Sequence, residues 1–109
     1  MLFSQKRRIT YRGSKEHFVK NHYFYPGYPI IKRGIYYCSR MISAQHGTEF
    51  SDSHYEKIKK VYSIWICTNP PEYRRNTING YSIAETQMVG NVSEEVSNYD
   101  LMTAILICL

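Results

Sequence analysis

The sequence predicts an α/β fold in which one main helix packs on a small mixed sheet. Apolar residues recur at spacings of four, three and four within residues 29–46, which is typical of an amphipathic helix. Two β-branched and apolar runs, 61–67 and 101–109, have the length and composition of buried strands. A chain of 109 residues is long enough for one domain with a single core, and too short for two.

Residues 1–23 carry no sustained hydrophobic period. Residues 9–11 fit a short strand, whereas residues 16–19 fit a strand or a helix equally well. We therefore treat residues 1–23 as a basic N-terminal segment of undefined structure.

The predicted helix follows a turn at Pro26 and Gly27, and Pro29 suits the first helical position. Gly47 is a typical residue to end it. The apolar face expected to pack on the sheet consists of Ile31, Ile35, Cys38 and Ile42. If Ile35 is buried there, its truncation to alanine should cost about 2–5 kcal/mol.

The two apolar runs predict neighbouring strands. Nearly every position of 61–67 is apolar, which favours a central strand covered on both faces, with Ile64 and Ile66 against the helix. The run 101–109 is expected beside it. No turn or covering element follows that run, so an open edge or face would let the protein self-associate through its C-terminal strand.

The stretch between these strands is polar. Residues 72–80 end in Asn79 and Gly80 and predict a turn region. Residues 81–86 alternate moderately, as an exposed strand would, and residues 89–98 fit a loop.

Two blocks of sequence resemble a known family. The first, 24–45, contains Tyr-Pro-Gly-Tyr-Pro, and the second spans 55–67. They resemble the PD-(D/E)XK nuclease family of transposase-like proteins (Rpn-like, Firmicutes type), and the likeness reaches residue 109. The resemblance implies that residues 24–109 form a partial nuclease domain, an incomplete restriction-endonuclease-like core. In the family, Mg²⁺ held by carboxylates cleaves DNA.

The family's catalytic residues cannot be carried over to this chain. The family pattern has an Asp on one strand and Glu-x-Lys or Glu-x-Gln on the next, and in register the triplet falls on Val19, Lys20 and Asn21. Valine cannot bind a hard cation. Glu16 is the only carboxylate in the first 48 residues, three places out of register, with no upstream Asp as its partner. We therefore expect no catalytic residue, no metal ligand and no cofactor.

The excess positive charge lies in the N-terminal segment. The chain has a net charge of +5, and residues 24–109 are balanced. The basic residues before them are Lys6, Arg7, Arg8, Arg12, Lys15 and Lys20, against the single carboxylate of Glu16. Such a segment favours a contact with DNA, with Lys6, Arg7, Arg8 and Arg12 as candidate residues. The alternative is that residues 1–23 are not native sequence of the family but were left upstream of a gene remnant by a frameshift.

A second candidate surface runs along the predicted helix. Arg33, Tyr37 and Arg40, with Ala44, form a basic and aromatic stripe. The stripe fits a contact with a phosphate backbone, or a solvated face with a tyrosine at its edge.

Cysteine usage and hydropathy indicate a cytoplasmic protein. The three cysteines, Cys38, Cys67 and Cys108, form no Cys-x-x-Cys pair, so they predict core residues of a reducing compartment and no zinc site. No apolar span of 18 residues and no signal-peptide core is present, so no membrane partner is expected.

The resemblance and the residues together predict a truncated or remnant member of the family without nuclease activity. Two alternatives remain. The first is a non-specific nucleic-acid-binding protein that uses the basic segment and the helix face with Arg33 and Arg40. The second is an active metal-dependent DNA endonuclease completed by a partner chain that supplies the missing carboxylates.

Overall fold

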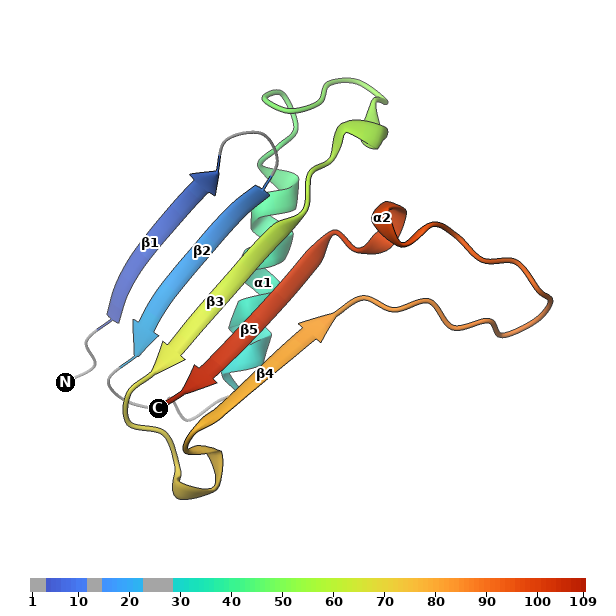
Figure 1. The fold of residues 1–109 in the computed structure, drawn as a ribbon. Coiled ribbons are helices and arrows are strands. Elements are labelled where there is room, and N and C mark those ends of the chain that lie inside the picture. Colours follow the sequence, from blue (N-terminus) through green and yellow to red (C-terminus); the bar gives the residue numbers. More distant parts are fainter. Residues whose placement is uncertain (1–3, 12–14, 23–28) are drawn as a thin grey trace.

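The computed structural model describes residues 4–11, 15–22 and 29–109, the first two ranges by their backbone. One main helix lies against a five-stranded sheet with the order β1-β2-β3-β5-β4 (Figure 1). The strands are β1 (Ser4–Tyr11), β2 (Lys15–His22), β3 (Val61–Cys67), β4 (Thr77–Ser82) and β5 (Met102–Cys108). The helices are α1 (Ile30–Ser43), α2 (Val96–Tyr99) and two single 3-10 turns, Tyr55–Lys57 and Glu72–Arg74.

The sheet is mixed, as the sequence predicts. Strands β2, β3 and β5 run parallel, while β1 and β4 pair antiparallel with their neighbours. Parallel strands need a crossover connection, and α1 lies in the connection between β2 and β3. The predicted α/β class, with one main helix on a mixed sheet, is therefore confirmed.

The N-terminal residues that the sequence left undefined include two strands. Residues 9–11 fall in β1 and residues 16–19 in β2, which forms an antiparallel pair with β1 and a parallel pair with β3. The predicted turn at Pro26 and Gly27 lies outside the described residues, and so does Arg12.

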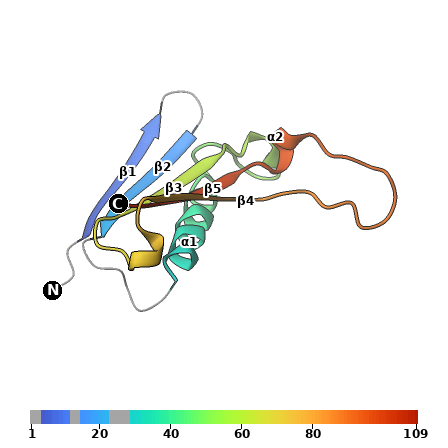
Figure 2. The ribbon, with the colours of Figure 1, turned by 60° about the horizontal axis from the view of Figure 1, so that its bottom comes forward.

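The helix covers one face of the sheet (Figure 2). Along β3 the burial alternates: Val61, Ser63, Trp65 and Cys67 are buried, while the residues between them are half-buried. The expectation that this strand is covered on both faces is wrong. Ile64 and Ile66 lie on the face away from α1, because successive side chains of a strand point to opposite sides.

The predicted inner face of α1 is displaced. The buried residues are Ile30, Gly34, Cys38 and Met41, so of the predicted set only Cys38 is fully buried. Ile35 is 47% exposed. A Cβ on Gly34 would lie 3.1 Å from Trp65 Nε1 and 3.3 Å from Ala104 Cβ, so the helix approaches the sheet through its glycine. The burial of Ile35, on which the large cost of Ile35→Ala depended, is therefore wrong.

The ends of α1 also differ from the prediction. The helix begins at Ile30 with Pro29 as its N-cap, so Pro29 is not the first helical residue as predicted, and the helix stops at Ser43 with Ala44 as its C-cap. Gly47 lies three residues beyond the cap, in a turn where its positive φ of 89° is natural for glycine. It is therefore a loop residue and not the helix cap.

Strand β4 contradicts the predicted turn at residues 72–80. Asn79 and Gly80 lie inside this strand, paired with Leu106 and Ile105 of β5. The exposed strand predicted from residue 81 is real only as far as Ser82. The predicted loop 89–98 contains the start of α2.

Strand β5 lies beside β3, as predicted. Its other edge pairs with β4, so the expectation of an open edge on the C-terminal strand is wrong. Its face away from α1, with Ile105 and Ile107 half-buried, is not covered by α1, so self-association through this strand stays a prediction. Ala104, Leu106 and Cys108 are buried on the α1 side. The strand is therefore interior to the sheet, and the edges belong to β1 and β4.

Candidate functional site

The positions that correspond to the family's catalytic triplet lie on β2. In the parallel register, Val19 pairs with Ile64 and Asn21 with Ile66. They thus stand beside the central strand, directly before the segment that leads to α1. Among the residues whose side chains are described, no group of three or more His, Cys, Asp or Glu could hold a metal ion.

The predicted helix stripe separates into two parts. Arg33 and Tyr37 come together: the guanidinium donates to the Tyr37 hydroxyl over 3.4 Å. The guanidinium carbon also lies 5.3 Å from the centroid of the Trp65 ring. The Tyr37 and Trp65 rings are tilted by 44° with centroids 5.6 Å apart. Arg33 and Tyr37 are half-buried and cover Trp65, so most of their surface packs against the core and is not available to a ligand.

Arg40 belongs to the other part of the stripe. It is exposed, and its guanidinium carbon lies 5.8 Å from the ring centroid of Tyr36, which is itself 56% exposed. Of the three helix residues predicted to bind nucleic acid, Arg40 is the one that solvent reaches freely.

The basic N-terminal residues fall on the edge of the sheet. Lys6, Arg7 and Arg8 are consecutive positions of β1, which pairs only with β2 among the described strands. The structure therefore places this charged run on an outer strand, as far across the sheet as possible from β4.

The cysteines are free and buried, in agreement with the prediction that they are core residues. Burial raises the pKa of the Cys38 thiol to about 11 and that of the Cys67 thiol to about 12, where contact with Cys108 adds to the effect. Because a thiolate is the reactive form, neither group is suited to nucleophilic catalysis near pH 7.

An ion pair that the sequence analysis missed joins the starts of β3 and β5. Lys60 Nζ lies 2.8 Å from both carboxylate oxygens of Asp100. Burial acts to lower the pKa of Lys60, but hydrogen bonds and charges from Asp100 and Tyr62 outweigh it, and the pKa is raised. The two residues are 40 positions apart, so no local signal could have paired them.

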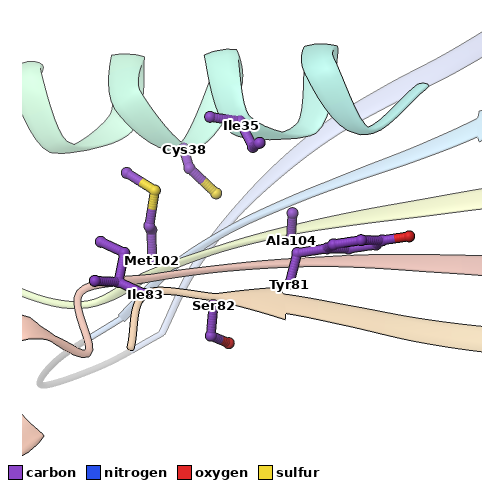
Figure 3. Close-up of a pocket in the computed structure, with 7 residues that line it drawn as sticks. All are labelled: Ile35, Cys38, Tyr81, Ser82, Ile83, Met102 and Ala104. Carbon is purple, nitrogen blue, oxygen red and sulfur yellow. The ribbon is translucent and has the colours of Figure 1, made fainter. Parts of the chain in front are cut away.

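An apolar cavity of about 230 Å³ lies between α1 and the β4 side of the sheet (Figure 3). It exists because α1 packs on β3 and β5 and leaves β4 uncovered. We call it the apolar pocket; its lining residues are Ile35, Cys38, Tyr81, Ser82, Ile83, Met102 and Ala104. Because this lining is almost entirely carbon, the pocket suits an apolar side chain or a small apolar molecule and offers no acid–base chemistry.

No protein-family model matches the chain, and neither does any curated protein or solved structure. Within the part of the chain that the structure describes, no helix is long and apolar enough to cross a membrane.

Proposed function

We propose that this chain is a remnant or truncated member of the PD-(D/E)XK nuclease family without nuclease activity, located in the cytoplasm. The observation that carries the proposal is Val19 at the position of the family's metal-binding glutamate. The order of the elements supports it: β2 carries that position, α1 follows, and β3 lies parallel beside β2. The helix and strands therefore come in the sequence that the resemblance implies, while the carboxylates are missing.

The purified chain is expected to leave a supercoiled plasmid intact in the presence of Mg²⁺ or Mn²⁺. Two carboxylates on neighbouring strands are needed to hold the ion and activate water. Val19→Glu alone should remain inactive, because no upstream Asp completes the pair. Metal-dependent nicking that follows this protein through purification would contradict the proposal. Nicking that needs a second chain bearing the carboxylates would instead support the endonuclease completed by a partner.

A second candidate function is non-specific binding of nucleic acid. The observation that favours it is the run Lys6, Arg7 and Arg8 on the edge strand β1, within a segment of six basic residues and one acidic residue. Edge position and uniform charge suit a phosphate backbone, and each neutralised phosphate releases counterions.

Duplex DNA is expected to bind without sequence preference, and log K should fall with log salt with a slope no steeper than about −5. Neutralising Lys6, Arg7 and Arg8 to glutamine should make the slope shallower by about 1 for each of the three that contacts a phosphate. Substitution is preferable to deletion, because residues 15–22 pair with β3. Arg40→Gln is the matched control. An unchanged slope in the triple variant, with a shallower one in Arg40→Gln, would assign the contact to the helix.

A further inference from the structure

Residues 83–95 leave the sheet as a long projection, which we call the arm. The arm follows β4 and returns to the short helix α2, and it extends well beyond the body of the protein (Figure 1). Its outer end is apolar: Met88 is 88% exposed, Val89 98% and Val92 81%. An apolar tip held in water is unfavourable unless another surface covers it.

The arm is shaped by its own hydrogen bonds. Gln87 Nε2 donates to the Val92 carbonyl over 3.3 Å and to Ser93 Oγ over 2.8 Å. Nearer the base, the backbone N–H of Glu94 donates to both carboxylate oxygens of Glu85 at 3.2 Å. Gly90 turns the chain at the tip with a φ of 83°. The tip is therefore held in place in advance, which reduces the entropy lost on docking.

The apolar pocket lies at the base of the same arm. Ile83, the first residue of the arm, lines the pocket together with Ser82, and Ile83 is 45% exposed there. The volume of about 230 Å³ exceeds the roughly 150 Å³ of an engineered apolar cavity that takes up benzene. The space is therefore sufficient for one or two aliphatic side chains.

The two features can meet only between molecules. Six extended residues from Ile83 span about 20 Å, so the tip of the arm cannot return to the pocket at its own base. When two arms lie side by side in opposite directions, the tip of each reaches the base of the other. A twofold axis between them repeats that contact, and a twofold interface is the commonest self-complementary arrangement.

We propose that the protein forms a twofold dimer by reciprocal arm exchange, in which the tip residues Met88 and Val89 of each copy enter the apolar pocket of the other. The occupant is a second copy, because the exposed apolar tip and the apolar pocket belong to the same chain and one symmetric contact buries both pairs. Met102 and Ala104 of β5 line the pocket, but the interface does not require strand pairing at an edge of β5. It is independent of the proposed nuclease relationship.

Sedimentation velocity of the full chain at tens of micromolar tests the proposal. The wild type should sediment as a dimer, and Val89→Asp as a monomer with unchanged circular dichroism, since Val89 makes no contact with the core. The matched control is Ile78→Asp: Ile78 is 72% exposed on β4 but lies on the sheet face away from α1. It should leave the dimer intact. A monomeric wild type, or a dimer lost with Ile78→Asp and kept with Val89→Asp, overturns the proposal.

Cross-linking locates the contact. Val89→Cys and Ile83→Cys variants are made in a Cys38→Ala background, because Cys38 also lines the pocket, and they are then mixed and oxidised gently. The other native cysteines, Cys67 and Cys108, are buried. Disulfides should join the tip of one variant to the base of the other in preference to joining two tips. Predominantly tip-to-tip or base-to-base products would mean that the arms do not exchange in this way.

Discussion

Replacing Trp65 with alanine is expected to lower the free energy of unfolding by about 3–5 kcal/mol, the usual range for truncating a buried large aromatic. The Trp65 side chain is 1% exposed at the centre of β3. Helix α1 packs directly on this side chain, because Gly34 of the helix lies against the indole nitrogen. The same ring carries Arg33 and Tyr37 on its flank. Truncating this side chain therefore leaves a cavity and also removes the contacts that hold α1 on the sheet.

Urea unfolding measured by circular dichroism checks this value, with two variants as controls. Ile35→Ala removes an aliphatic side chain from α1 at a site that is 47% exposed, so it should lower the free energy of unfolding by about 1 kcal/mol or less. Trp65→Phe keeps an aromatic ring and loses the hydrogen bond that the indole N–H donates to the Ser63 hydroxyl, so its cost should lie between the two. If Trp65→Ala and Ile35→Ala lowered the free energy of unfolding equally, Ile35 would be buried against the sheet, as hydropathy alone predicts.

The predicted and the observed inner faces of α1 differ, and this difference shows how much of the fold the sequence could predict. Periodicity located α1 almost to the residue at its start, and composition located β3 and β5. The inner face was misjudged because hydropathy selects the isoleucines, whereas close packing selects the smallest residue. Gly34 admits the indole, and the helix turns by about one residue so that glycine and Cys38 face the sheet.

Asn79 and Gly80 illustrate a second limit. Their local preference is for a turn, but pairing with β5 supplies ladder hydrogen bonds to an edge strand, and this tertiary contact prevails. The apolar pocket is likewise invisible in the sequence, because it depends on where α1 lies relative to β4. Of the candidate nucleic-acid residues, Arg33 looks basic and free in the sequence, yet it packs against Trp65 through a contact that spans 32 positions.

Gln45 is a buried polar residue whose role also becomes clear only in three dimensions. Its side chain is fully buried. The oxygen and the nitrogen of its side-chain amide each form a hydrogen bond with the backbone of Lys59. Nε2 donates to the Lys59 carbonyl over 2.8 Å, and the Lys59 N–H donates to Oε1 over 2.8 Å. The amide thereby ties the end of α1 to the segment that leads into β3. A buried pair of this kind is costly to break, because two backbone groups would lose their partners.

Gln45→Glu is expected to cost about 3–5 kcal/mol at pH 7, since it places an unpaired carboxylate against the Lys59 carbonyl. Burial and that carbonyl favour the protonated acid, so the pKa of the new carboxyl should rise above its ordinary value in the folded state. A raised pKa in the folded state means that stability is retained below the ordinary value and lost as the pH increases. The protonated acid can donate to the Lys59 carbonyl as the amide does, so at pH 4 the cost should fall to about 1 kcal/mol.

Urea unfolding of this variant and the wild type at pH 4 and pH 7 measures the difference. Gln45→Leu is the matched control, because it removes both hydrogen bonds without adding a titratable group; its cost should be about 2 kcal/mol at either pH. A cost for Gln45→Glu that is the same at both pH values would mean that water reaches the carboxylate. The amide would then not be the buried connection between α1 and β3 that its contacts with Lys59 indicate.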